Sequence, residues 1–352
     1  MPGLTYPPFP EGLPTHPLLV IDYQLIKQGD KQEIDRLWEA ATKLGFWYLK
    51  NHGVVEEIDA MFDMGAETLK LPLEEKMKFE QGDSGNSFGY KVVGGNAVDE
   101  SGALDTIELI NVSRNDALAW PGKVHRDYPS TVNERMESVI KPFVQKSMEI
   151  NFTCISTFDE KLGLPKGTLL SKHAVEAPSC CEARCIKKAP GVADDKQAIG
   201  SHTDFGSLSF LHNRNGGLQV LPPGSDEWQY IKPIPGHAVC NIGDALSIFS
   251  GGILRSNLHR VVTPPKEQAA YERWSLVFFT RPADDTELRA FTELSPMIAD
   301  AVANNPNPGK FSTGQTSRSW YYRRMAGQRI NNRKGPETWR GSRGTEHKPY
   351  VY

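Results

Sequence analysis

From about residue 181 to residue 283, the chain is a succession of short apolar runs interrupted by turns, and this pattern constrains its fold more than any other feature. Paired glycines and paired prolines separate the runs, at 216–217, 222–223, 251–252 and 264–265. Such pairs end regular structure, so we expect strands joined by tight turns. The predicted strands are 198–211, 217–221, 228–231, 238–241, 246–249, 258–263 and 273–280.

The residues before this β-rich part mix helical and strand patterns. Apolar residues at helical spacing predict helices over 31–43 and 55–70. Compact apolar runs at 18–22 and 45–50 predict two buried strands. The polar, glycine-rich stretch at 82–95 is predicted to be a loop.

A long helical pattern over 131–162 separates these two parts, and Pro142 within it is expected to kink or divide the helix. We therefore divide the chain into an N-terminal α/β region (1–130), a bracing helix (131–165), a β-core (166–283) and a C-terminal extension (284–352). The extension is expected to be helical at first and then polar and basic. We expect these parts to pack as one functional unit.

The composition excludes several classes of partner. With 40 Lys and Arg against 43 Asp and Glu, the formal charge is −3, which gives no general attraction to nucleic acid or to an anionic membrane. No apolar run approaches the length of a membrane span, and the first residues lack the features of a secretory signal. We therefore expect a cytoplasmic protein with a small-molecule partner; the sequence leaves its oligomeric state open.

Cysteine usage agrees with this location. The number of cysteines is five, which is odd, and no pair has C-x-x-C spacing. We interpret them as free thiols of an intracellular protein. A zinc site built on Cys180, Cys181 and Cys185 is an alternative, but the usual ligand spacing is missing.

The strongest candidate for chemistry is the segment His202-Thr203-Asp204. Residues i and i+2 of a strand project from the same face, so an imidazole and a carboxylate would converge on one point. His259, on a later predicted strand, is the candidate third ligand. Two His and one carboxylate leave positions open on an octahedral metal, a set that suits Fe(II) in oxygen chemistry.

A second His-x-acid segment, His125-Arg126-Asp127, is weaker. It lies among Pro and Gly without an alternating strand, so we interpret it as a surface loop. The first segment instead begins an apolar run and has Gly200 and Gly206 beside it. Because glycine permits close approach to the backbone, we expect a ligand to come near there.

Arg273 and Ser275 lie on one face of the last predicted strand. An inward-facing arginine in a β-core needs an anion, and a guanidinium offers a bidentate fork to a carboxylate. The anion could be a structural Asp or Glu. It could equally be a dicarboxylate cosubstrate whose other end chelates the metal.

Together these segments resemble the Fe(II)- and 2-oxoglutarate-dependent dioxygenases of the isopenicillin-N-synthase-like family. The resemblance covers most of the chain, and the texture of residues 334–346 is similar to fungal members. It implies a mainly β fold with flanking helices, built on a double-stranded β-helix, or jelly roll. The motifs that carry it are Leu19–Tyr23, Gly45–Gly53, His202–Gly206, Asn241–Leu246, Ser256–Val261 and Arg273–Ser275.

The resemblance also implies roles and a reaction. His202, Asp204 and His259 would bind Fe(II), while Arg273 and Ser275 would hold the C5 carboxylate of 2-oxoglutarate. O2 would be the third reactant. Decarboxylation of 2-oxoglutarate to succinate and CO2 would drive oxidation, most often hydroxylation, of a C–H bond in a small, natural-product-like molecule from secondary metabolism.

One departure from the family concerns the cosubstrate. Many relatives carry a Tyr that helps to hold 2-oxoglutarate, and here the stretch contains Lys187 and Lys188 instead. Whichever lysine faces inward could supply a donor, or both could be solvated. Two alternatives stay open: a 2-oxoglutarate-independent Fe(II) oxidase of the same fold, and a non-catalytic small-molecule-binding protein.

The substrate contacts are harder to predict. In the relatives, the pocket draws on the N-terminal region, the residues after the Asp ligand and the C-terminal extension. The resemblance therefore makes Phe205, Phe210 and the loop 82–100 candidates here.

Overall fold

Two β-sheets packed face to face form the core of the protein. The computed structural model describes residues 6–191 and 197–346. The larger sheet has eight strands, in the order β1-β2-β10-β7-β12-β5-β4-β3, and the smaller has four, in the order β6-β11-β8-β9. All neighbouring strands are antiparallel except the parallel pair β1 and β2. This is the antiparallel, helix-flanked architecture that the sequence predicted.

The strands of the larger sheet are β1 (Val20–Asp22), β2 (Phe46–Lys50), β3 (Gly89–Lys91), β4 (Ile107–Ser113), β5 (Glu182–Lys188), β7 (Leu208–Asn213), β10 (Ala238–Ile242) and β12 (Arg273–Thr280). Those of the smaller sheet are β6 (Gln197–His202), β8 (Leu218–Val220), β9 (Gln229–Tyr230) and β11 (His259–Val262).

The space between the sheets is filled by apolar side chains that alternate along the strands. Phe46 of β2 and Val277 of β12 meet Val220 of β8 and Val261 of β11 in one buried cluster. Because the side-chain period of a strand is two, each of these strands directs its other face away from this cluster. The outer face of the larger sheet therefore needs a second cover.

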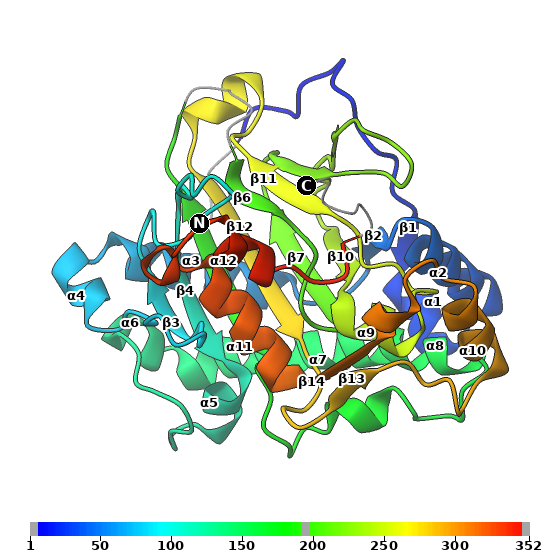
Figure 1. The fold of residues 1–352 in the computed structure, drawn as a ribbon. Coiled ribbons are helices and arrows are strands. Elements are labelled where there is room, and N and C mark those ends of the chain that lie inside the picture. The colour runs from blue at the N-terminus through cyan, green and yellow to red at the C-terminus, as the bar shows by residue number, and fades with distance from the viewer. Residues whose placement is uncertain (1–5, 192–196, 347–352) are drawn as a thin grey trace.

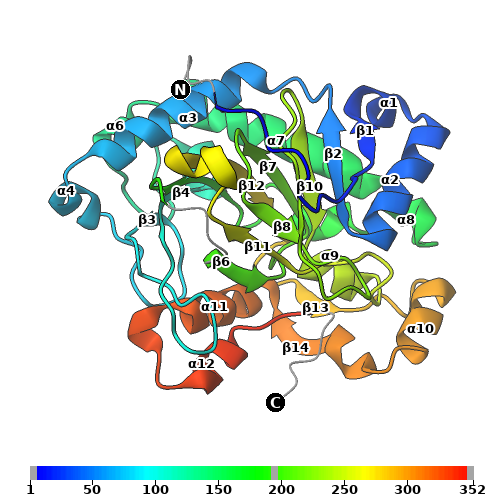
Figure 2. The ribbon, with the colours of Figure 1, turned by 90° about the horizontal axis from the view of Figure 1, so that it is seen from above.

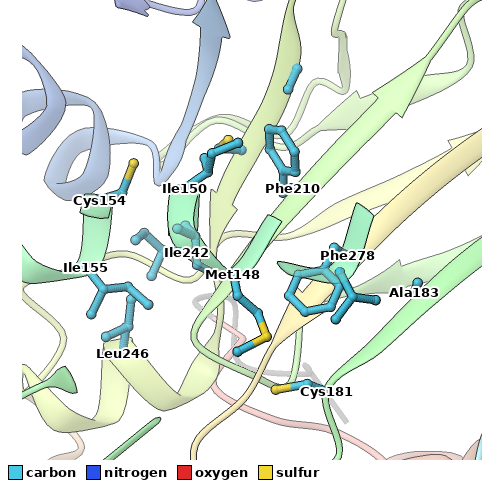
Figure 3. Packing of buried hydrophobic residues seen from close by; sticks show 14 of the residues in the cluster. Met148, Ile150, Cys154, Ile155, Cys181, Ala183, Phe210, Ile242, Leu246 and Phe278 are labelled. Carbon is cyan, nitrogen blue, oxygen red and sulfur yellow. The ribbon is translucent and has the colours of Figure 1, made fainter. Parts of the chain in front are cut away.

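Helices from the N-terminal half supply that cover. The main ones, α3 (Val55–Lys70) and α7 (Lys141–Ser156), pack on the larger sheet (Figures 1 and 2). Figure 3 shows Met148 and Ile150 of α7 directed toward Phe210 and Phe278, which are fully buried on β7 and β12. This contact between helix and sheet is the main hydrophobic core.

The other helices of this half are short, apart from α2. They are α1 (Tyr23–Gln28), α2 (Lys31–Lys43), α4 (Leu73–Met77), α5 (Arg114–Ala119), α6 (Ser130–Asn133), α8 (Phe158–Lys161) and a 3-10 turn at Leu170–His173. Helix α2 begins where predicted because the Asp30 carboxylate accepts the Glu33 backbone N–H at 2.9 Å, a standard N-cap.

Residues 131–162 do not form one continuous helix. Helix α6 is followed by a π-helical turn at Met136–Ile140, and only then does α7 begin. Pro142 occupies the first turn of α7, where a missing backbone N–H costs no helical hydrogen bond.

The C-terminal part packs on the opposite side of the core from α3 and α7 (Figure 2). Its elements are β13 (Glu287–Arg289), α10 (Pro296–Ala303), β14 (Ser312–Thr316), α11 (Ser317–Gln328) and α12 (Pro336–Gly341), with 3-10 turns at Pro308–Phe311 and Ile330–Asn332. A hairpin of β13 and β14 thus precedes the longest helix of this part, so the segment is less helical at its start than predicted. No helix in the described residues combines the length and apolar character needed to cross a membrane.

Two strand predictions were wrong in detail. The run 246–249 belongs to helix α9 (Asp244–Phe249), which is buried on all sides. A fully buried helix faces no water, so its sequence lacks a regular polar face. Periodicity alone therefore cannot distinguish its short apolar run from a buried strand. The run 198–211 is two strands, β6 and β7, because the chain leaves the smaller sheet after His202 and enters the larger sheet at Leu208. A further 3-10 turn lies at Lys266–Ala270.

Candidate active site

Three of the predicted site residues meet at the edge of the smaller sheet. His202 ends β6, His259 begins β11, and the two are direct register partners. Asp204 lies two residues beyond His202. Its Oδ1 atom is 3.6 Å from Nε2 of each histidine, and the possible ligand atoms of the three residues all lie within 4.8 Å of one another. In the described part of the chain, no other group of three or more such side chains comes this close.

The remaining polar atoms of these side chains are held by the protein. Nδ1–H of His202 donates to the Gly200 carbonyl at 2.7 Å, and Nδ1–H of His259 donates to the Asn257 carbonyl at 3.2 Å. Both Nε2 lone pairs therefore face the common centre. Hydrogen bonds of this kind fix the tautomer of a metal-binding histidine.

The Asp204 carboxylate is oriented in the same way. Its Oδ2 atom accepts from Ser209 Oγ at 2.5 Å and from Asn241 Nδ2 at 2.6 Å, which leaves Oδ1 for the centre. Burial alone would raise the pKa of Asp204, but His259, His202 and Asn241 together hold it well below its usual range. Burial and the nearby His202 lower the pKa of His259 to about 4. At neutral pH His259 is thus a neutral imidazole and Asp204 an ionised carboxylate, donors of the kind that suit Fe(II).

The two glycines beside this segment make room for protein backbone. A Cβ atom on Gly200 would lie 2.0 Å from the Val98 carbonyl oxygen, and one on Gly206 would lie 2.5 Å from the Thr280 carbonyl oxygen. At both positions protein backbone therefore makes a close approach that a side chain would block, and Gly200 also lines the pocket described below. The glycines let the loop at 96–98 and the end of β12 pack against the segment that carries His202 and Asp204.

A buried arginine of the C-terminal part holds the same segment from the other side. Arg324 of α11 donates from Nη2 to the Thr203 carbonyl at 3.0 Å and pairs through Nη1 with Asp244 of α9. Its Nε atom donates to the Ser342 carbonyl at 2.9 Å. The Asp244 backbone N–H in turn donates to the Asp204 carbonyl at 2.8 Å. This Arg324 cluster therefore fixes the backbone on both sides of Asp204.

Arg273 and Ser275 lie buried on the inner face of β12, as predicted. Arg273 is 2% exposed; it donates from Nε to the Gly216 carbonyl at 2.8 Å and from Nη1 to Ser275 Oγ at 2.6 Å. Among residues 6–191 and 197–346, no carboxylate pairs with it. Burial lowers the pKa of Arg273 to about 10, so the side chain is still a cation at neutral pH. A buried cation of this kind is suited to an anionic ligand.

The two lysines of β5 face opposite ways. Lys187 is register partner of Trp274 and pairs with Glu272 at 3.1 Å on the outer face. Lys188 is the register partner of Arg273 and is 7% exposed. Its Nζ atom donates to the Ala189 carbonyl at 3.2 Å. Of the two, Lys188 is therefore the lysine beside Arg273.

A pocket opens beside the cluster of His202, Asp204 and His259. His202, Asp204 and Phe205 form one end, and α11 and α12, orange and red in Figure 1, contribute side chains to its wall. Phe210, which the sequence suggested as a contact, lies instead in the core between β7 and α7 (Figure 3). The other lining residues are Asn96, Ala97, Val98, Asp105, Ile107, Leu109, Arg184, Ile199, Gly200, Phe279, Arg281, Met325, Gln328 and Trp339.

Two lining arginines were missed in the sequence. Arg281 continues the same alternation as Arg273 and Ser275, and Arg184 continues that of Lys188. The signal was therefore present in the period-two pattern of both strands. The alternation pattern alone did not show that the two arginines share one partner, Glu182, which is fully buried between them.

The remaining alternatives for metal binding are not supported. His125 and Asp127 are both exposed in the segment between α5 and α6, as their interpretation as a surface loop requires. Cys181 donates to the Arg281 carbonyl and Cys185 to the Met61 carbonyl, so these thiols point to different parts of the core. All five cysteines are free.

The jelly-roll core and its cluster of two histidines and one carboxylate define the class of this protein as a non-haem Fe(II) oxygenase. Comparison with known proteins agrees. Residues 177–282 match the profile of the 2OG-Fe(II) oxygenase superfamily, and residues 18–134 match that of the non-haem dioxygenase in morphine synthesis N-terminal.

Several fungal proteins are similar over most of their length. The oxidoreductase vrtI of Penicillium aethiopicum is 30% identical over 315 residues, which cover 82% of this chain and 70% of that protein. A 2-oxoglutarate-dependent dioxygenase of Aspergillus fumigatus is 27% identical over 84% of each chain. A full-length Neurospora crassa protein, crystallised in complex with alpha-KG, superposes with a TM-score of 0.70, at 22% identity, over 90% of this chain and 97% of that one.

The chain belongs to the 2OG-Fe(II) oxygenase superfamily. It is therefore a dioxygenase that uses Fe(II), 2-oxoglutarate and O2. The predictions of family, enzyme class and cofactors from the sequence are confirmed.

Proposed function

We propose that this enzyme oxidises, by hydroxylation, a C–H bond of a small, natural-product-like molecule, and that His202, Asp204 and His259 hold the iron. The observation that carries the assignment is the convergence of three ligand atoms whose other polar atoms are all bound by the protein. The match of residues 18–134 to the profile described as non-haem dioxygenase in morphine synthesis N-terminal supports a role in secondary metabolism.

For the cosubstrate, we propose that Arg273 and Ser275 bind the C5 carboxylate of 2-oxoglutarate. The support is a buried guanidinium without a carboxylate partner in the described residues, with a hydroxyl beside it. Lys188 lies on the same inner face and adds positive charge where relatives carry a Tyr. Two cations and a hydroxyl are a suitable set for one end of a dicarboxylate.

Bound iron and 2-oxoglutarate supply the oxidising power, through the O2-dependent conversion of 2-oxoglutarate to succinate and CO2. The residues of this chain determine which bond is attacked. Phe205, Phe279 and Met325 give the pocket apolar walls near the metal-binding residues, so a substrate C–H group can be held there with water excluded. The Arg324 cluster holds the Asp204 backbone, and so the centre, in position.

The test begins without a substrate. Fe(II) is added to the anaerobic protein, 2-oxoglutarate is titrated, and the visible charge-transfer band is recorded. We expect a weak band that saturates with 2-oxoglutarate, is absent in His202→Ala, and is followed by succinate formation when O2 and a substrate panel are added. Iron binding without such a band would contradict the assigned cosubstrate site and favour the 2-oxoglutarate-independent oxidase.

We also propose that the protein acts in the cytoplasm, alone or as a homo-oligomer, on a small molecule and without nucleic acid. Five free, buried cysteines support a reducing compartment. We further propose that the segments 1–130, 131–165, 166–283 and 284–352 act as one catalytic unit. The shared pocket supports this, since its wall includes Val98, Arg184 and Trp339 from three of these segments.

A further inference from the structure

One wall of the active-site pocket carries an excess of positive charge. Glu182 is fully buried, and its Oε1 atom accepts from Arg184 Nη2 at 2.7 Å and from Arg281 Nη2 at 3.0 Å. Its Oε2 atom accepts from Ser87 Oγ. One carboxylate is thus shared between two guanidinium groups. We call Glu182, Arg184 and Arg281 together the Arg281 cluster.

The other charged pair of this wall is balanced within itself. The pocket is also lined by Asp105, whose Oδ2 atom pairs with Lys91 and whose Oδ1 atom accepts the Gly94 N–H at 2.7 Å. Both oxygens of the Asp105 carboxylate are thus engaged by other donors, and neither arginine donates to it in the described residues. Three cations and two carboxylates leave this wall with one net positive charge.

The donors of the two arginines are not all used. Arg281 is 4% exposed, and its Nη1 atom donates to the Cys180 carbonyl, but its buried Nε–H has no hydrogen-bond acceptor in the described structure. Arg184 donates from Nε to Asn111 Oδ1 at 2.8 Å, and its Nη1 atom has no acceptor among the described residues. An unsatisfied buried donor is costly, so native structures seldom keep one without a ligand or water to satisfy it.

Aromatic rings flank the two guanidinium groups. The Phe279 ring lies 4.9 Å from each of the two guanidinium groups, and Arg281 also lies 4.7 Å from the Tyr321 ring. These contacts fix the planes of the guanidinium groups. A ligand that fills this pocket therefore meets this cationic donor pair together with apolar side chains such as Leu109, Phe279 and Met325.

We propose that Arg281 and Arg184 bind a carboxylate of the substrate, and that the enzyme accordingly acts on a small apolar carboxylic acid. This inference rests on the proposed function, because it assigns the substrate class of the same site. The carboxylate would be anchored at the Arg281 cluster, while the apolar body extends toward His202 and Asp204. Arg281 and Arg184 are then residues that determine specificity.

This carboxylate is distinct from that of 2-oxoglutarate. Arg273 and Arg281 lie at opposite ends of β12, eight residues apart in sequence, or roughly 26 Å along the strand. Only Arg281 lines the pocket. One dicarboxylate of the size of 2-oxoglutarate cannot therefore serve both arginines.

The test uses the anaerobic protein loaded with Fe(II) and 2-oxoglutarate. Calorimetry measures the binding of matched acids and amides: phenylacetate and phenylacetamide, 3-phenylpropanoate and its amide, 2-naphthoate and its amide. In at least one pair we expect the acid to bind about tenfold more tightly, or more, than the amide, because a charged hydrogen bond replaces a neutral one. Absence of acid preference in all three pairs overturns the proposal.

Two variants of the cluster then separate recognition from packing. Arg281→Met should remove the acid preference, whereas Glu182→Gln should increase it, because it removes the internal carboxylate that competes for both arginines. If the cluster only stabilised the fold, both substitutions would change the ratio of acid to amide affinity in the same direction. That result would overturn the proposal. If Arg281→Met does not fold, Arg184→Met takes its place.

A last measurement keeps this proposal distinct from the proposed function. If Arg281→Met weakens the affinity for 2-oxoglutarate as strongly as Arg273→Ala does, Arg281 holds the cosubstrate and the substrate proposal is wrong. If the charge-transfer band is normal but no acid preference exists, the proposed function stands and only the substrate class is wrong.

Discussion

The His202–Asp204 segment, where we propose that iron binds, lies between two buried arginine clusters that differ in how fully their hydrogen-bonding capacity is used. Arg324 has all three guanidinium nitrogens engaged, by Ser342, Thr203 and Asp244. Arg281 has two engaged and a buried Nε–H without an acceptor in the described residues. We call the first cluster closed and the second open.

The difference indicates two uses of a buried charge. In the closed cluster, Arg324 pairs with Asp244, so this charge is balanced and the chain itself provides the partners. In the open cluster, two arginines share Glu182, and the surplus faces a pocket. A buried cation with a full set of partners holds structure in place, whereas one with partners missing is suited to a ligand.

The largest expected effect comes from the metal centre itself, and it sets the scale for both clusters. His202→Ala should reduce succinate formation to background, because one of three iron ligands is lost. The fold should persist, since His202 lies at the end of β6 and contributes no core volume. His125→Ala is the matched control, because it removes an exposed histidine with the same His-x-Asp spacing. Full activity in His202→Ala would contradict the assigned centre.

The closed cluster should matter more for stability than the open one. Arg324→Met leaves the fully buried Asp244 without its cation and should lower the free energy of unfolding by about 3–5 kcal/mol. It also releases the Thr203 carbonyl, and iron affinity should fall roughly 10- to 100-fold. Denaturant unfolding and Fe(II) titration measure the two effects.

Arg281→Met is the matched substitution in the open cluster. It should destabilise the protein less, because Glu182 keeps Arg184 and Ser87 as partners. Equal losses of stability in the two variants would break the distinction between closed and open clusters.

Arg273 is another buried arginine whose donors are not all used, since acceptors in the described residues engage only its Nε and Nη1 atoms. It therefore extends the comparison to a second open site. Arg273→Ala should weaken 2-oxoglutarate binding by about 2–4 kcal/mol, roughly 30- to 700-fold, because a buried carboxylate loses its charged partner. Ser275→Ala, which removes only one neutral donor, should cost about 0.5–1.5 kcal/mol. Titration of the charge-transfer band gives both affinities, and equal values for the wild type and Arg273→Ala would place the cosubstrate elsewhere.

The sequence predicted the centre better than the pocket, for a physical reason. His202, Asp204 and His259 lie on or directly beside strands, where period-two alternation and one long-range pairing are enough to bring them together. Arg273 and Ser275 follow the same rule on β12. Strand geometry is local, so alternation could place each pair on one strand face, whereas the roles proposed for these residues came from the family resemblance.

The pocket and the clusters depend on contacts that no local pattern encodes. Arg324 lies on α11, and its partner Asp244 lies on α9. The apolar run 246–249 in α9 had been predicted as a strand. Arg184 and Arg281 had the right alternation, but only the buried position of Glu182 shows that one carboxylate serves both. Tertiary packing, rather than alternation, decides which buried charges are left with unused donors.

The smallest expected effect is a change in the acid response of the open cluster. Burial alone would raise the pKa of Glu182, but Arg184 and Arg281 hold it below its ordinary value of 4.5. The unfolded chain then binds more protons than the folded one near that pH, so the stability that Glu182 contributes is present above about pH 4.5 and is lost as pH falls further.

Glu182→Gln removes this titrating group and should therefore flatten the dependence of unfolding free energy on pH between about pH 5 and 3. At pH 7 the variant should be about 1–3 kcal/mol less stable than the wild type, because charged hydrogen bonds become neutral ones, and the gap should narrow in acid. Glu293→Gln is the control, since its exposed ion pair with Arg289 is screened by solvent and should leave the slope unchanged. If Glu182→Gln kept the slope of the wild type, as the control does, Arg184 and Arg281 would not be holding Glu182 ionised, and the shared carboxylate would not distinguish the open cluster from the closed one.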